Sequence, residues 1–120
     1  MQNKAFIQDG LIFNVYMGDQ DYESVMDLAG RTLELAREFK VAGLPVLVIT
    51  DITRIGRLGT GIRKAAKEAF EIIPFDKVSI FGGNSYMDQV VPVILRFLRR
   101  DEMVGYCRSQ EEAETWLREK

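Results

Sequence analysis

The chain has 120 residues, of which 47% are hydrophobic and 28% are charged, and its formal net charge is −2. This length and composition predict a single globular domain over residues 1–120 and exclude a disordered chain. The slightly acidic balance argues against nucleic-acid binding, which usually requires a basic excess. No apolar run approaches the roughly 20 residues that a membrane span requires.

Cysteine and histidine usage narrows the chemistry. The single cysteine, Cys107, allows no internal disulfide, and the first residues lack a signal-peptide pattern, so we expect a cytoplasmic protein. The absence of histidine removes Ser-His and Cys-His nucleophile pairs together with the commonest metal ligand. We therefore expect a binding protein and not an enzyme, with no cofactor and no metal site.

The first half of the chain predicts a hairpin, a helix and a buried strand. Residues 5–8 and 11–17 have strand character, and Asp9-Gly10 between them favours a type I′ turn, which needs positive φ at both positions. Residues 22–40 carry apolar side chains three and four apart, with Asp19 or Asp21 as the cap. Gly43 is placed to end this helix, and the apolar run 46–49 predicts a strand buried on both faces.

The second half alternates helices and strands. We expect helices over 60–73, from 85 to about 100 and over 110–119, with strands over 77–81 and 103–106. Ser85 and Asp88 have the spacing of a capping box, and Pro92 is expected to bend its helix. The order predicts an α/β fold with a mixed, mostly parallel five-stranded sheet, an N-terminal hairpin and about four helices.

One candidate site follows the central strand, where parallel α/β sheets usually bind ligands or partners. A loop over 53–61 leads into the helix, whose free N–H groups and positive dipole end favour an anion. Cations surround the same point, which suits a phosphate, a carboxylate or an acidic protein surface. The plainer alternative is a capped helix with solvated arginines. The candidate residues are Arg54, Arg57, Gly59, Thr60, Gly61, Arg63 and Lys64.

A second candidate site is a ligand pocket between the loop after Ile49 and the helix that contains Met87 to Ile94. Residues at two strand ends and on the first helical turns would line it. The alternative is that they form an ordinary turn, cap and packing contact. The candidate residues are Asp51, Gly83, Ser85, Tyr86, Met87 and Val91.

The pattern after Leu44 resembles a known family. A strand ending Ile49-Thr50-Asp51-Ile52, followed by a glycine-bearing loop and a helix, resembles the STAS domains of anti-sigma-factor antagonists. The later part is similar to the bacterial SpoIIAA-like (STAS/SEC14-type) family. The strand Val78-Ser79-Ile80-Phe81-Gly82, the proline-containing helix and the acidic helix from Glu111 to Leu117 carry that similarity.

The resemblance implies a noncatalytic regulatory module. In such domains the loop after the central strand and the next helix start contact a kinase-type anti-sigma factor, and the serine of an Asp-Ser pair is phosphorylated. Gly59 stands where that aspartate would be, and Thr60 falls at or next to the serine, which makes Thr60 a candidate phosphorylation site. SEC14-like relatives imply the alternative of a small apolar or lipid ligand.

The hairpin also predicts self-association. Phe6, Phe13 and Tyr16 are expected to be exposed on it, so its edge strand is a candidate surface for a homodimer.

Overall fold

The computed structural model describes residues 2–100 and 102–119, which form five strands and four helices. They follow each other along the chain as β1 (Lys4–Gln8), β2 (Leu11–Gln20), α1 (Tyr22–Val41), β3 (Leu47–Leu58), α2 (Ile62–Ile72), β4 (Lys77–Phe81), α3 (Ser85–Leu98), β5 (Val104–Cys107) and α4 (Gln110–Arg118).

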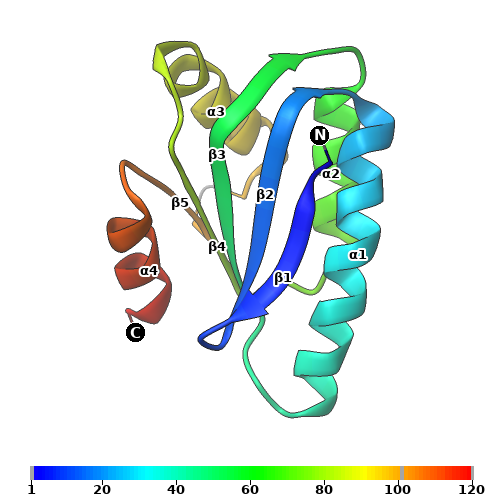
Figure 1. Cartoon of the computed structure of the whole chain (residues 1–120), viewed down its shortest axis with the longest axis vertical. Coiled ribbons are helices and arrows are strands. Elements are labelled where there is room, and N and C mark those ends of the chain that lie inside the picture. The colour runs from blue at the N-terminus through cyan, green and yellow to red at the C-terminus, as the bar shows by residue number, and fades with distance from the viewer. Residues whose placement is uncertain (1, 101, 120) are drawn as a thin grey trace.

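The strands form one sheet whose spatial order, β1-β2-β3-β4-β5, is also their order in the chain (Figure 1). β1 pairs with β2 antiparallel, and every later pairing is parallel. The mixed, mostly parallel five-stranded sheet predicted from the sequence is confirmed, as are the N-terminal hairpin and the number of helices.

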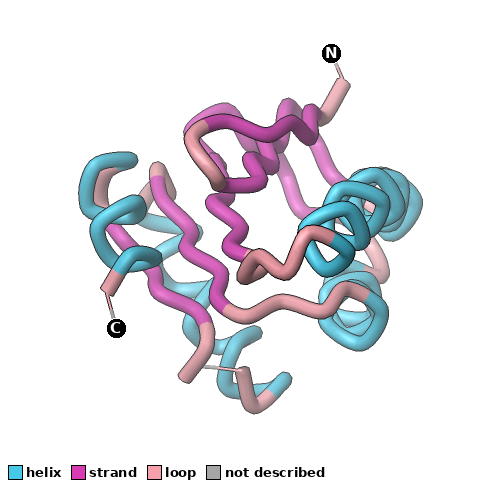
Figure 2. Tube along the Cα trace, turned by 90° about the horizontal axis from the view of Figure 1, so that it is seen from below, coloured by secondary structure: helices cyan, strands magenta, loops and turns pink. Residues whose placement is uncertain are grey.

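The two faces of the sheet are covered unequally (Figure 2). Helices α1, α2 and α3 lie over one face, whose buried strand residues include Ile12, Val48 and Val78. Helix α4 lies over the other face and packs Ala113 and Leu117 into a smaller cluster. The end of α4 also meets the hairpin, because Arg118 Nη2 donates to the backbone oxygen of Asp9 at 2.8 Å.

Three local features, a turn, a helix cap and a helix end, form as the sequence predicts. Asp9 and Gly10 have φ of 53° and 77°, the left-handed pair that a type I′ hairpin turn needs. Asp21 caps α1 in a reciprocal capping box with Ser24, since each side chain accepts from the other's backbone N–H. Gly43 has φ of 74° after the end of α1.

The predicted loop over 53–61 is wrong for most of its length. Strand β3 continues to Leu58, and its second half pairs with the end of β2, as in Met17 with Arg54 and Gln20 with Leu58. Two register shifts interrupt this ladder, so the apolar side chains do not alternate strictly, and that hides the strand from a period-two pattern. Only residues 59–61 connect β3 to α2.

The starts of α2 and α3 also differ from the prediction. Gly61, with φ of 82°, is the N-cap of α2, and no side chain caps that helix, so Thr60 lies outside it. Asn84 caps α3 by accepting from the backbone N–H of Met87, and Ser85 is the first helical residue. The Asp88 carboxylate accepts instead from the Tyr106 hydroxyl at 2.6 Å.

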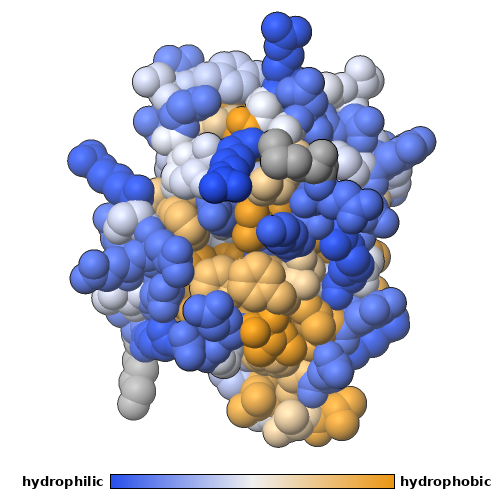
Figure 3. Space-filling model, viewed as in Figure 1, coloured by the Kyte–Doolittle hydropathy of each residue, from blue (hydrophilic) through white to orange (hydrophobic). Residues whose placement is uncertain are grey.

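The surface of the hairpin is less exposed than the sequence predicts. Phe6 is 38% exposed, whereas Phe13 stacks beneath it and is buried, and Tyr16 is half-buried on the opposite face. Figure 3 shows apolar side chains gathered over the lower part of the hairpin and the α1–β3 connection. Self-association through this edge stays a prediction. No helix within residues 2–100 and 102–119 is long and apolar enough to cross a membrane.

Candidate functional site

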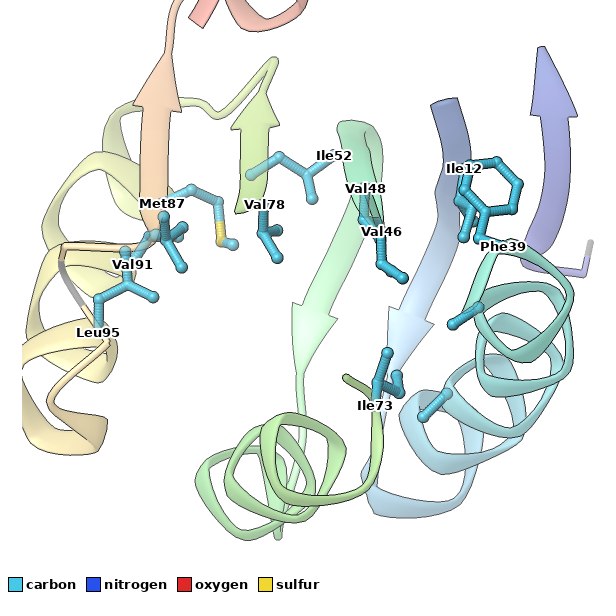
Figure 4. Close-up of a cluster of buried hydrophobic side chains, with 13 residues drawn as sticks. Ile12, Phe39, Val46, Val48, Ile52, Ile73, Val78, Met87, Val91 and Leu95 are labelled. Carbon is cyan, nitrogen blue, oxygen red and sulfur yellow. The ribbon is translucent and has the colours of Figure 1, made fainter. Parts of the chain in front are cut away.

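A pocket of about 180 Å³ lies between the sheet and helices α1, α2 and α3. The helices stand over the strands and leave this space at the centre of the layer. Figure 4 shows Met87 of α3 directed toward Val78 of β4, with Ile73 beyond the end of α2 on another side of the same cluster. The pocket therefore lies inside the main core of the domain, and much of its lining consists of residues of that core.

The wall of the pocket is almost entirely apolar. Valine, isoleucine, leucine, alanine, methionine and phenylalanine side chains from the sheet and all three helices supply it, and none of its lining residues within the described chain is charged. The apolar lining residues are Val25, Ala29, Val48, Ile52, Ile55, Leu58, Ile62, Ala66, Ala69, Phe70, Ile73, Phe75, Val78, Ile80, Met87, Val91, Ile94 and Leu95.

The polar lining residues come mainly from the floor of the sheet. Asn14 and Thr50 are register partners on β2 and β3, and both are buried. Thr32 of α1 lies within hydrogen-bonding distance of Asn14 Oδ1, at 2.5 Å, and of the Leu28 backbone oxygen, at 2.9 Å. Tyr16 also lines the pocket, and burial raises the pKa of its hydroxyl to about 12, so the group stays protonated at neutral pH.

Gln20 also lines the pocket and is held by a separate hydrogen-bond network. Its amide exchanges hydrogen bonds with the Asn3 side chain at 2.8 and 3.0 Å, and its nitrogen also donates to the Met17 backbone oxygen. The Asn3 oxygen accepts from the Met17 backbone N–H as well. Gln20 is therefore already engaged, and its role here is structural.

The seam between α2 and α3 borders the pocket. A surface groove between the starts of these helices shares Leu58, Ile62 and Ile94 with the pocket, so the two spaces lie next to each other. Two side chains bridge the seam: Arg63 lies 5.6 Å from the centre of the Phe97 ring, and Arg100 lies 5.9 Å from that of Phe70. A cation–π contact at an exposed site, such as that of Arg63 with Phe97, contributes about 0.5–1 kcal/mol.

The structure brings part of the predicted basic site to this groove. Gly59, Gly61, Arg63 and Lys64 line it together with Tyr86, which the sequence assigns to the other site. The two sites predicted separately therefore adjoin each other at the seam.

The four cations do not converge on one point. Arg54 and Arg57 are exposed on the end of β3, while Arg63 turns toward α3 and Lys64 lies 5.4 Å from the centre of the Tyr22 ring on α1. Within the described chain, none of the four forms a salt bridge. The result is a broad basic surface around exposed Thr60 and not a closed anion site.

Met87 and Val91, from the predicted ligand-pocket set, line the pocket, and both are buried. The other four do not line it. The Asp51 carboxylate accepts from the backbone N–H and the hydroxyl of Thr53 at 2.9 and 2.7 Å, a local turn-like contact. Gly83 packs against the Tyr106 hydroxyl, while Ser85 and Tyr86 are exposed on the first turn of α3.

The sequence did not reveal that Asn14 and Thr50 lie side by side on the sheet beneath the pocket, where they form its polar floor. Asn14 sits in an otherwise apolar strand, and Thr50 ends the buried run of β3, so each position was visible as a polar residue in an apolar context. Their proximity was not visible, because it depends on the pairing register of β2 with β3. Across residues 2–100 and 102–119, the cysteine and acidic side chains form no group able to hold a metal ion.

Cys107 is a buried core residue whose thiol is disfavoured from ionising. It is buried beside α4, and this desolvation raises the pKa of its thiol, with the nearby Glu112 and Glu119 carboxylates acting in the same direction. All three effects disfavour the thiolate, which is the reactive form of cysteine.

Neither a protein-family model nor a curated protein sequence matches the chain. Among solved structures, an uncharacterised DUF3478-family protein of Shewanella loihica with a SpoIIAA-like fold is similar over 96% of this chain and 91% of its own, at 15% identity and a TM-score of 0.65. The unphosphorylated anti-sigma factor antagonist SpoIIAA matches over 94% of both chains, at 10% identity and a TM-score of 0.56.

A further match is the Bacillus cell fate determinant SpoIIAA in its phosphorylated form, similar over 97% of this chain and 99% of its own, at 12% identity and a TM-score of 0.58. These likenesses define the class of fold, an α/β domain with a mixed sheet. More narrowly, the chain has the SpoIIAA-like fold, which confirms the resemblance drawn from the sequence at the level of the fold.

Proposed function

We propose that the protein is a noncatalytic binding module that holds a small apolar ligand in the pocket between the sheet and helices α1, α2 and α3. The observation that carries this proposal is the pocket itself: about 180 Å³ with an apolar wall. Protein cores are normally packed to the density of organic crystals, so an apolar space of this size is unusual. The sequence favours a partner surface first, whereas the pocket supports ligand binding, and we therefore propose ligand binding first.

The volume sets the size of the ligand. An engineered apolar cavity of about 150 Å³ stays dry and binds benzene, so a pocket of about 180 Å³ suits a molecule of one ring or a short alkyl chain. Ligands of that size gain their affinity from the apolar area that leaves water. A long acyl chain would need the pocket to open along the α2–α3 seam.

The test is a titration with toluene followed by NMR and by thermal unfolding. We expect shifts confined to resonances of the lining residues and a rise in Tm, since a ligand at about 100 times its Kd adds about 2.7 kcal/mol of stability. Ala69→Leu, which fills the pocket from α2, should abolish both effects. The same change at exposed Ala42, outside the pocket, is the control. No shift in the wild-type protein at millimolar toluene would contradict the proposal.

A second candidate function is contact with an acidic protein partner at the basic surface. Four exposed cations lie around Thr60 without salt bridges among the described residues, and the fold is that of an anti-sigma factor antagonist. We infer that the end of β3 and the start of α2, from Arg54 to Lys64, contact a regulatory partner such as a kinase-type anti-sigma factor.

Thr60 is the proposed modification site of that surface. It is exposed directly before the N-cap of α2, where a phosphate would meet free backbone N–H groups and nearby cations. Mass spectrometry of the protein isolated from its host should locate a phosphoryl group on Thr60. The group should be absent from Thr60→Ala and retained in Thr115→Ala, an exposed threonine on α4. A Thr60 that is never modified under any growth condition would remove the switch.

A further inference from the structure

The pocket contains polar groups that the protein leaves without hydrogen bonds. Asn14 and Thr50 are 6% and 9% exposed, both line the pocket, and they lie side by side in the β2–β3 register. No hydrogen bond within the described chain involves the Thr50 or the Tyr16 hydroxyl, and neither oxygen is fully enclosed by protein atoms, so both stay open to the pocket. A few polar groups that open into an otherwise apolar pocket and have no protein partner are the groups that orient a ligand in such sites.

Asn14 adds a third group, whichever way its amide is turned. The Thr32 hydroxyl lies close to both the Leu28 oxygen and the Asn14 amide, but it carries only one hydrogen. If Thr32 donates to Leu28, the Asn14 nitrogen must face Thr32 and its oxygen faces the pocket. If Thr32 donates to the Asn14 oxygen, the Asn14 amide nitrogen is left without an acceptor. In either orientation one end of the amide has no hydrogen-bonding partner among the described residues.

The remaining wall excludes charge. None of the pocket-lining residues in the described chain is charged, so an ionised carboxylate, phosphate or ammonium would lose its hydration without meeting a counter-charge. A neutral hydroxyl or carbonyl loses much less, and here it would meet both donors and acceptors. Tyr16 stays protonated at neutral pH and adds a further donor.

We propose that the ligand of the pocket is a neutral small molecule with an apolar body and one hydrogen-bonding group, a hydroxyl or a carbonyl, which binds Asn14 and Thr50 on the floor of the sheet. This inference rests on the proposed ligand-binding function and deepens it, because it assigns the chemical class. Asn14 and Thr50 are then the specificity-determining residues, while the apolar wall supplies most of the affinity.

The experiment compares toluene, phenol and benzoate, which share one ring and differ in the polar group. Their Kd values are measured by calorimetry on the wild-type protein, Asn14→Leu and Thr50→Val, two changes that keep approximate size and remove the polar atoms. We expect phenol to bind the wild-type protein within about tenfold of toluene, because its hydroxyl regains the hydrogen bonds it loses on leaving water. Benzoate should not bind.

In Asn14→Leu, phenol should weaken by about tenfold while toluene binds equally or more tightly, since only phenol loses a hydrogen bond. Thr50→Val should show the same pattern with a smaller loss. Thr32 keeps the Leu28 oxygen as its acceptor, so the core retains that bond, and Thr50→Val gives the same readout should Asn14→Leu fail to fold.

The possible results separate the two proposals. If toluene binds the wild-type protein but phenol and toluene change by the same factor in both variants, the polar floor does not select the ligand and this inference is overturned. The same holds if phenol binds far more weakly than toluene throughout, as it would if a tightly held water already occupied the floor. If no probe binds the wild-type protein, the ligand-binding function itself fails.

Discussion

Filling the pocket from α2 should make the ligand-free protein more stable. Ala69 is half-buried, lines the pocket and packs against the main core. The pocket has a volume of about 180 Å³, so it has room for a larger side chain at this position. Ala69→Leu adds three carbons to that space, and at about 0.8 kcal/mol per buried carbon the gain is at most about 2.4 kcal/mol.

Strain and incomplete burial reduce this gain, because overpacking typically costs about 1 kcal/mol or more. We therefore expect Ala69→Leu to raise the free energy of unfolding by about 1–2 kcal/mol, with a Tm increase of roughly 3 to 6 °C for each kcal/mol in a domain of this size. Urea unfolding should show a higher midpoint with an unchanged slope. Ala42→Leu, at an exposed position, should change the free energy by less than about 0.5 kcal/mol.

A folded Ala69→Leu protein that is less stable than the wild type would refute the reasoning, since it would mean that the space closes or is already filled. A more stable variant that no longer binds toluene would show a trade-off in which the unfilled volume serves binding at the expense of stability.

Three other predictions concern the core. Ser79→Ala should raise the free energy of unfolding by about 1 kcal/mol, because the Ser79 hydroxyl is fully buried and unpaired among the described residues, and a lower urea midpoint would contradict this. Gly105→Ala should destabilise the protein by more than about 2 kcal/mol, since the new methyl group would collide with the Trp116 ring, and a double-mutant cycle with Trp116→Ala should recover much of the loss. The free energy of unfolding should fall as the pH rises from about 10 to about 12. Tyr16 ionises near pH 10 in the unfolded chain, whereas in the folded protein it keeps its proton to about pH 12, so a rising pH favours the unfolded state. Denaturation curves at pH 9 and 11 measure this fall, which Tyr16→Phe should reduce.

The sequence predicts those parts of the fold that local chemistry decides. The turn at Asp9-Gly10, the cap at Asp21 and the helix end at Gly43 depend on the conformations and hydrogen bonds of a few consecutive residues, and all three are confirmed. The continuation of β3 beyond Asp51 depends instead on a partner strand and two register shifts. Exposed arginines and a glycine in that segment favour a loop until β2 is known to lie beside it.

The candidate site also combines residues that the sequence could indicate with residues that only the fold brings together. Met87 and Val91 are the two residues of the predicted ligand pocket that line the pocket of the structure, because both lie on the buried face of α3. The polar floor of the pocket is formed by Asn14 and Thr50, and its walls are formed by residues of α1, α2 and α3. Contacts between such distant segments are fixed by packing and register, which no single stretch of sequence contains.

The strand order of the sheet, which is also the order of the chain, has a consequence for how the protein folds. Each strand pairs with the one before it, and only one turn or one helix has to be closed into a loop for each pairing. The entropy lost at each step is therefore small, and no strand has to be inserted between two that are already paired. Contacts of α4 with the hairpin close the series last: Ala113 and Leu117 share a cluster with Leu11 and Phe13, and the hydrogen bond from Arg118 to Asp9 spans 109 positions.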